Sequence, residues 1–193
     1  MSVKREDRPN YLVSMEQLVT VLLPCIEAGQ EVVLTVTGVS MTPLLRHRRD
    51  QVVLRAVDPT ALQPGDVPLY RRANGQYVLH RVVERDDGAQ LLRLGCETPL
   101  PSTAEGLHYT LLGDGQTTPE PGVTPDQILA VATAFHRGKR IISCDSPAYR
   151  RRVVRWYRRM RIRPAVVYLY LLPGRAVRKA ERIIQSWTHT KRN

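Results

Sequence analysis

The sequence predicts a mostly β fold of the α+β class, with one helix before a β-rich core and basic helices after it. Short apolar runs separated by Gly, Pro and Asp fill residues 31–140. Apolar residues recur at helical spacing on either side of that region. With 193 residues, 42% of them apolar, the chain can bury the core of one domain. We divide it into an N-terminal arm and helix (1–30), a β-rich core (31–140) and a basic helical extension (141–193).

The first predicted element is a helix from Ser14 to about Ala28. Ser14 is a capping residue with Gln17 at the capping-box position, and Gly29 is placed to end the helix. We expect one helix face to pack on the sheet, namely Leu18, Val21, Leu22 and Cys25.

Short strands follow from residue 31 to residue 140. Residues 31–36 and 51–54 are rich in β-branched and apolar side chains. Asn74-Gly75 predicts a hairpin between a strand containing Tyr70 and a strand at 77–79. Residues 86–108 are less regular, which indicates a surface loop or insertion, and a turn at 136–140 closes the β region.

The chain is predicted to become helical after Pro147. One helix face is apolar while arginines fill the other, and a second basic helix is predicted at about 175–187. The residues of the apolar face are Tyr149, Val153, Trp156, Tyr157 and Met160.

Positive charge is concentrated in this C-terminal part of the chain. Residues 137–193 hold 17 of the 29 Lys and Arg residues but only two acids, Asp145 and Glu181. Their net charge is +15, so residues 1–136 carry −4 of the total of +11. Any attraction to a polyanion therefore belongs to the tail. We predict peripheral contact with anionic membrane; docking of an acidic partner or a merely solvated face are alternatives. Nucleic-acid binding is disfavoured because the sequence carries no known binding module.

The cysteines and the hydropathy both bear on location. The three cysteines lie far apart in the sequence with no CxxC pair, which argues against a zinc site or a disulfide framework and fits a reducing compartment. No stretch reaches the ~18 apolar residues of a membrane-spanning helix, and residues 18–26 do not have the pattern of a secretory signal. The prediction is a cytoplasmic protein, with peripheral membrane contact as a hypothesis.

A serine and a histidine stand out as candidate catalytic residues. Ser40 follows a predicted strand and lies between Gly38 and the Met-x-Pro turn formed by Met41 and Pro43. A serine hydroxyl needs a base to act as a nucleophile. His80, forty residues later, is the candidate, since an imidazole has a pKa near neutrality.

These residues resemble the serine peptidase superfamily that includes type I signal peptidases and LexA-type self-cleaving repressors. Four blocks occur in order and cover roughly residues 31–140. Residues 38–43 resemble the nucleophile box, 49–53 with 63–67 the paired segments after it, and 78–83 the general-base box. Residues 112–115 with 124–130 resemble the late Gly-Asp box and its closing strand. A histidine followed by an arginine resembles the endoplasmic-reticulum-type branch, whereas bacterial members usually use lysine.

The resemblance implies roles for individual residues. Ser40 is the nucleophile and His80 the general base, and Asp114 is the candidate acid that orients His80. Cys96 and Asp66 are weaker alternatives to Asp114, which could itself be a turn residue. The remaining implied roles concern substrate and oxyanion: Gly38, Met41 and Pro43 line the substrate site, and the Ser40 backbone N–H binds the oxyanion. From the sequence alone, Met41 could equally fill the core and Pro43 form a turn. Neither a metal nor another cofactor is expected.

The predicted function is a serine endopeptidase that cleaves a leader or signal segment from a precursor peptide. The resemblance implies a substrate that lies extended beside a strand, with small side chains next to the cut. Two departures from the family are an arm too short for a helix-turn-helix module and the lack of a predicted membrane anchor. These departures favour a cytoplasmic precursor as the substrate. The alternative is a non-catalytic peptide-binding or regulatory protein whose basic tail contacts membrane or nucleic acid.

Overall fold

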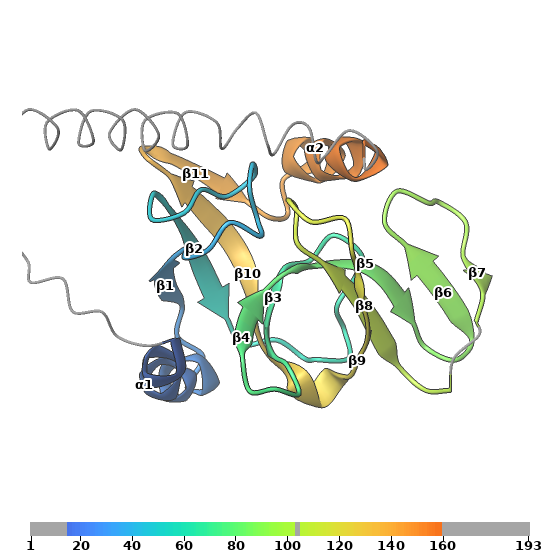
Figure 1. Ribbon diagram of the computed structural model, residues 1–193, viewed down its shortest axis with the longest axis horizontal. Coiled ribbons are helices and arrows are strands. Elements are labelled where there is room, and N and C mark those ends of the chain that lie inside the picture. Colours follow the sequence, from blue (N-terminus) through green and yellow to red (C-terminus); the bar gives the residue numbers. More distant parts are fainter. Residues whose placement is uncertain (1–14, 103–104, 160–193) are drawn as a thin grey trace, which may run out of the picture.

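A computed structural model describes residues 15–102 and 105–159 of the chain, which form two antiparallel sheets and two α-helices (Figure 1). Sheet A has the order β1 (Val32–Thr35), β2 (Asp50–Arg55), β10 (Ile128–Arg137), β3 (Pro68–Arg71), β4 (Tyr77–Leu79), with β11 (Arg140–Ser143) also paired to β10. Sheet B has the order β7 (Leu100–Pro101), β6 (Gln90–Arg93), β5 (Arg81–Asp86), β8 (His108–Leu112), β9 (Glu120–Val123). The predicted mostly β, α+β class is confirmed.

The chain passes from sheet A to sheet B at His80. Strand β4 ends at Leu79 and pairs with β3, whereas β5 begins at Arg81 and pairs with β6 and β8. His80 is therefore the single residue between two strands of different sheets. Its position is fixed from both sides.

Strand β10 is the longest strand and the centre of sheet A. It pairs with β2 along one edge and with β3 and then β11 along the other. A short 3₁₀ helix, η1 (Pro125–Gln127), precedes it. The strand predicted after Thr124 is thus present. Because β11 extends to Ser143, sheet A continues slightly beyond the boundary predicted at residue 140.

The Asn74-Gly75 hairpin forms as predicted. Strands β3 and β4 pair antiparallel with Tyr70 opposite Val78. The Arg72 N–H donates to the Gln76 carbonyl at 2.8 Å, and the Gly75 N–H donates to the Arg72 carbonyl at 2.9 Å. The hairpin matters for the site because its far strand leads directly into His80.

The first helix, α1 (Met15–Glu27), lies within the predicted range and ends at the predicted glycine. The Gly29 N–H donates to the Ile26 carbonyl and the Gln30 N–H to the Cys25 carbonyl, which is the Schellman pattern. This pattern needs a left-handed residue, and Gly29 has φ of +80°. Ser14 lies outside the described residues.

The packing face of α1 differs from the prediction at one position. Val21 is 68% exposed, whereas Ile26 is buried and Leu22, Leu23 and Cys25 pack against the core. The prediction for Val21 was wrong because the helix presents the row containing Leu22 and Ile26, which are four residues apart, to β1 and its neighbours.

The second helix, α2 (Pro147–Arg158), begins after Ser146 as predicted. Tyr149 and Val153 are buried, and the Trp156 indole N–H donates to the Asp114 carbonyl at 2.7 Å. The apolar face of α2 is therefore packed against the β core. Met160 and the predicted helix at 175–187 lie outside the described residues.

Residues 86–108 are more regular than expected. Within this segment β6 pairs with β5 and the two-residue β7 pairs with β6, so the stretch widens sheet B. Among the described residues, no helix combines the length and apolar character needed to cross a membrane.

Candidate active site

The predicted nucleophile lies in a tight loop between β1 and β2. The Thr42 N–H donates to the Val39 carbonyl at 3.0 Å, which turns the chain around Ser40. The Gly38 N–H donates to His47 Nδ1 at 2.9 Å and fastens the start of the loop. Ser40 is half-buried within this turn. Ser40 therefore lies in the loop five residues after the end of β1 at Thr35, and not at the strand end that the sequence predicted.

The Gly-Asp-Gly turn after β8 packs directly against this loop. The Gly115 N–H donates to the Ser40 carbonyl at 2.7 Å. A Cβ atom on Gly115 would lie 2.7 Å from the Thr42 carbonyl oxygen, and one on Gly113 would lie 2.7 Å from the Ser40 carbonyl oxygen. Both contacts are closer than real Cβ atoms approach. The two glycines therefore allow the turn to support the nucleophile loop from beneath.

A cavity of about 300 Å³ lies beside this loop. Its apolar lining comes from Leu34, Val36, Met41, Val52, Leu54, Leu69, Tyr77, Val78 and Leu79. Its polar lining comes from Thr35, Thr37, Ser40, Arg72, His80 and Gln116. Strands β1 and β4 are the first and last strands in the order of sheet A, and both contribute residues to the cavity lining.

Ser40 and His80 both line this cavity, although forty residues separate them in the sequence. Within the described part of the chain, no hydrogen bond joins the two side chains. His80 is only 1% exposed, so the walls of the cavity shield its ring from bulk water.

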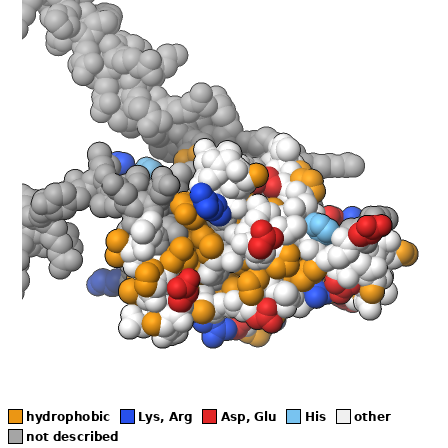
Figure 2. Space-filling view, turned by 90° about the horizontal axis from the view of Figure 1, so that it is seen from below, with side chains coloured by type: hydrophobic (Ala, Val, Ile, Leu, Met, Phe, Trp, Pro, Cys, Tyr) orange, Lys and Arg blue, Asp and Glu red, His pale blue; other side chains and the backbone are white. Residues whose placement is uncertain are grey.

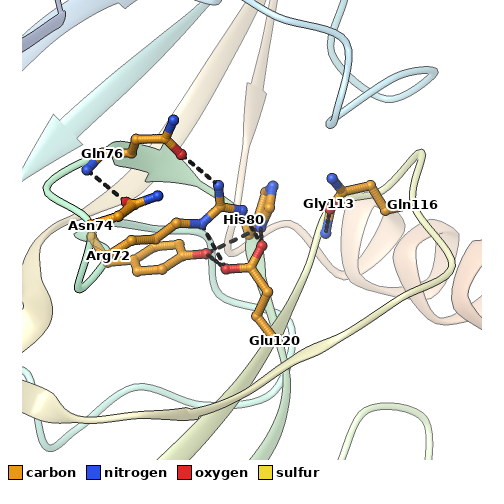
Figure 3. A network of polar contacts seen from close by, with 8 residues as sticks. Arg72, Asn74, Gln76, His80, Gly113, Gln116 and Glu120 are labelled. Atoms are coloured by element: carbon orange, nitrogen blue, oxygen red, sulfur yellow. Dashed lines mark hydrogen bonds and ion pairs between the residues drawn. The ribbon is translucent and has the colours of Figure 1, made fainter.

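His80 is held by side chains on the side of the ring that carries Nδ1. Its Nδ1 lies 3.2 Å from the Tyr70 hydroxyl and 3.4 Å from Glu120 Oε1. The Tyr70 hydroxyl donates to Glu120 Oε2 at 2.6 Å. In Figure 3, Arg72 lies to the left of His80, Glu120 lies below it and Gln116 lies to the right.

Arg72 completes this network. Its Nε donates to Glu120 Oε2 at 2.9 Å, and its Nη2 pairs with Glu120 Oε1. Its Nη1 donates to the Gln76 side chain across the hairpin at 3.1 Å. Desolvation alone would raise the pKa of Glu120, but the bonds from Arg72 and Tyr70 outweigh it and lower the pKa below its ordinary value. Glu120 is therefore ionised at neutral pH.

The environment of His80 favours the neutral imidazole. Burial lowers the pKa of His80 to about 4, with Glu120 and Asp114 opposing this shift and Arg72 adding to it. The ring is thus unprotonated at pH 7. An unprotonated imidazole can accept a proton, but a pKa of about 4 makes His80 a weaker base than a free imidazole.

The sequence predicted that Asp114 lies beside His80. The structure places it against Arg81 instead. Arg81 Nε and Nη2 donate to the two carboxylate oxygens of Asp114 at 2.8 and 2.7 Å, and Arg81 Nη1 donates to the Gly65 carbonyl at 2.7 Å. The physical reason is alternation along an extended chain, which points His80 and Arg81 to opposite sides. The carboxylate beside His80 is Glu120.

Arg81 and Asp114 form a buried ion pair beneath α2. Both side chains are almost fully buried, and the Arg81 guanidinium lies 5.6 Å from the centre of the Tyr149 ring. Desolvation would lower the pKa of Arg81, but the charge of Asp114 more than offsets it and raises the pKa. Arg81 therefore has a structural role as the charge partner of Asp114.

The other predicted positions are distributed around the loop. Met41 is buried and lines the cavity, whereas Gly38 and Pro43 lie in the same loop outside the lining. The alternatives to Asp114 lie elsewhere: the Asp66 carboxylate accepts the Gln63 N–H in a turn, and the exposed Cys96 thiol donates to the Thr98 carbonyl. Neither makes a hydrogen bond to His80 in the described structure.

Sequence reasoning missed Tyr70, Arg72 and Glu120. Tyr70 was recognised only as a strand residue, although a buried tyrosine hydroxyl requires a partner. Glu120 opens β9 and is 50 residues from Tyr70, so no local spacing connects them. Among the described residues, no group of three His, Cys, Asp or Glu side chains is arranged to hold a metal ion.

Comparison with known proteins adds no assignment to this geometry. No protein-family model matches the chain, and no curated protein shows significant sequence similarity to it.

Proposed function

We propose that this chain is a signal-peptidase-like serine endopeptidase that cleaves a leader or signal segment from a precursor peptide. Ser40 is the nucleophile and His80 the general base. The observation that carries the proposal is that these two residues, from separate sequence blocks, line one cavity. The neutral state of His80 and the strand edges beside the cavity add support.

The reaction begins when His80 Nε2 accepts the proton of the Ser40 hydroxyl and Ser40 Oγ bonds to the scissile carbonyl carbon. The carbonyl oxygen becomes an oxyanion, and the Ser40 backbone N–H donates to it. Among the described residues this N–H has no hydrogen-bond acceptor. The imidazolium then gives its proton to the leaving amine as the C–N bond breaks. Water, deprotonated by His80, hydrolyses the acyl-enzyme and releases Ser40.

The substrate is proposed to bind as an added strand. Strands β1 and β4 end the order of sheet A, so each has an edge that pairs with no described strand. Both strands contribute residues to the cavity, from Leu34 and Thr35 on one side and Tyr77 to Leu79 on the other. An extended peptide entering here gains main-chain hydrogen bonds from a strand edge, while apolar walls receive its side chains.

Location and membrane contact remain proposals as well. Cys25, Cys96 and Cys144 are free thiols, which fits a reducing compartment such as the cytoplasm. The exposed arginines of α2 support contact with an anionic membrane surface.

A peptide-library digest tests the enzymatic proposal. The wild type is incubated with peptides that span leader–mature junctions, and mass spectrometry identifies the products. Ser40→Ala and His80→Gln should each abolish cleavage, whereas Ser143→Ala and His108→Gln, outside the cavity lining, should retain it. Equal product from wild type and Ser40→Ala would refute the peptidase proposal.

The alternative function is peptide binding without cleavage. This alternative is supported by the absence of a hydrogen bond between the Ser40 and His80 side chains in the described structure, since a binding groove needs no such bond. The same library resolves it by pull-down: peptides that the wild type retains intact, with equal affinity in Ser40→Ala, would identify a binding protein.

A further inference from the structure

We propose, given the peptidase function above, that Glu120, acting through the Tyr70 hydroxyl, is the acidic residue that positions His80 and fixes its tautomer. Glu120 and Tyr70 are positioning residues: neither contacts the reacting atoms, and both act on the general base. Asp114 is instead a structural partner of Arg81. The inference follows from the contacts of the half-buried Glu120 with the buried Tyr70 and His80, and from which of these atoms carries a hydrogen.

The Tyr70 hydroxyl carries one hydrogen, which it can donate to only one acceptor at a time. Tyr70 is fully buried, and its Oη lies 2.6 Å from the ionised Glu120 and 3.2 Å from His80 Nδ1. A short bond to a carboxylate is the stronger of the two, so the hydrogen lies between Tyr70 and Glu120. Burial raises the pKa of Tyr70, so the phenol keeps this hydrogen throughout the physiological pH range.

The tautomer of His80 follows from this assignment. The Tyr70 oxygen has only lone pairs left to offer Nδ1, and so has Glu120 Oε1. Nδ1 must then carry the hydrogen of the neutral imidazole. Its other nitrogen, Nε2, keeps an unshared pair and makes no hydrogen bond within the described residues. This is the form of histidine that can take a proton from Ser40.

Glu120 also stabilises the cation that this proton transfer creates. Its Oε1 lies 3.4 Å from Nδ1, and its charge raises the pKa of His80 against the opposing effect of burial. Arg72 holds Glu120 in place and is itself bonded to the hairpin residue Gln76. Without Glu120 the ring would be harder to protonate in the transition state, so His80 would be a weaker base.

The experiment compares Tyr70→Phe, Glu120→Gln and Asp114→Asn by nitrogen NMR of the histidine side chains, with His80→Gln to identify the signal. Wild-type His80 should be the Nδ1–H tautomer at pH 7. Tyr70→Phe preserves shape and removes the nearer of the two acceptors that face Nδ1, so the fraction of the ring in the Nε2–H form should rise. Glu120→Gln should lower the pKa of His80 further. Asp114→Asn should leave the tautomer unchanged.

Steady-state kinetics with a peptide that the wild type cleaves provide the second measurement. Tyr70→Phe should lower kcat on the order of 100-fold with KM nearly unchanged, since the loss is in general-base catalysis. Glu120→Gln should lower kcat and move the acid limb of the pH profile to lower pH. Glu84→Gln is the matched control, because it weakens another Glu–Arg pair, with Arg93, outside the cavity lining.

The two proposals fail in different ways. If the wild type cleaves no peptide, the peptidase function is lost, while NMR still decides the state of His80. If the wild-type ring is the Nε2–H tautomer, or if Asp114→Asn alters it and Tyr70→Phe does not, the role of Glu120 and Tyr70 is overturned even in an active enzyme.

Discussion

At the scale of single residues, the site depends on which way His80 faces as the chain passes from β4 to β5. His80 points to Tyr70 and Glu120, while the next residue, Arg81, points to Asp114 beneath α2. Successive side chains of an extended segment alternate in direction. The two adjacent residues therefore have different roles: His80 faces the cavity, and Arg81 ties the Gly-Asp-Gly turn to the core.

Acid should destabilise the protein through His80. Its pKa falls from 6.5 to about 4 on folding. The contribution of neutral His80 to the free energy of unfolding is fully present above pH 6.5 and is lost as the pH falls toward 4. In that range the unfolded chain binds a proton at His80, whereas the buried ring of the folded protein does not. The loss is at most about 1.4 kcal/mol per pH unit.

Urea unfolding at pH 7 and pH 5 measures this effect. The wild type should lose more stability between the two pH values than His80→Gln, which lacks the titrating group. The other histidines contribute to both proteins and cancel in the comparison. An equal loss in both would show that His80 titrates normally.

Removing Asp114 should mainly reduce stability. Asp114→Ala leaves the Arg81 guanidinium buried without its carboxylate, and breaking such a pair costs about 3–5 kcal/mol of unfolding free energy. Thermal or urea unfolding measures the cost. Glu84→Ala breaks a more exposed pair and should cost less than about 1 kcal/mol. If Asp114→Ala were as stable as the wild type, the ion pair would not have the structural role described.

At the scale of elements, the turn after β8 packs against the loop that carries Ser40, the proposed nucleophile. Gly115→Ala should lower the rate of peptide cleavage, because its Cβ would meet the Thr42 carbonyl at 2.7 Å and push the loop away. A displacement of about 1 Å at a nucleophile can cost on the order of 100-fold in rate. The measurement is kcat and KM for Gly115→Ala and for Gly138→Ala; at Gly138 the φ of +63° strains alanine, but its Cβ would meet no atom within 4 Å. Equal cleavage rates in both variants would show that the packing of this turn against the Ser40 loop does not affect catalysis.

Elements whose signals are local could be predicted from the sequence. The β3–β4 hairpin, the Gly29 end of α1 and the start of α2 depend on residues within a few positions of one another. The partners of His80 could not be predicted, because Glu120 reaches it only through the pairing of β8 with β9. The partner of Asp114 was missed for a different reason: the direction of the side chains at 80 and 81 depends on where β5 begins.

At the scale of the whole molecule, the charges are unevenly placed. The face opposite α2 mixes apolar, acidic and basic side chains (Figure 2), whereas α2 bears exposed arginines that include Arg151, Arg152 and Arg155. The apolar residues Tyr149 and Val153 of α2 are buried in the core. They cannot also insert into a lipid bilayer while the protein stays folded. The exposed arginines of α2 are therefore expected to supply most of any attraction to a membrane.

Vesicle binding should consequently depend on salt and on the α2 arginines. Replacing Arg151, Arg152 and Arg155 by Gln should weaken binding to phosphatidylserine-containing vesicles by about 3 kcal/mol, on the order of 100-fold, since each basic residue near an anionic surface contributes about 1 kcal/mol. Sedimentation measures the bound fraction at low and high salt, with neutral phosphatidylcholine vesicles as control. Binding that survives high salt, or that is equal on neutral vesicles, would contradict a purely electrostatic contact.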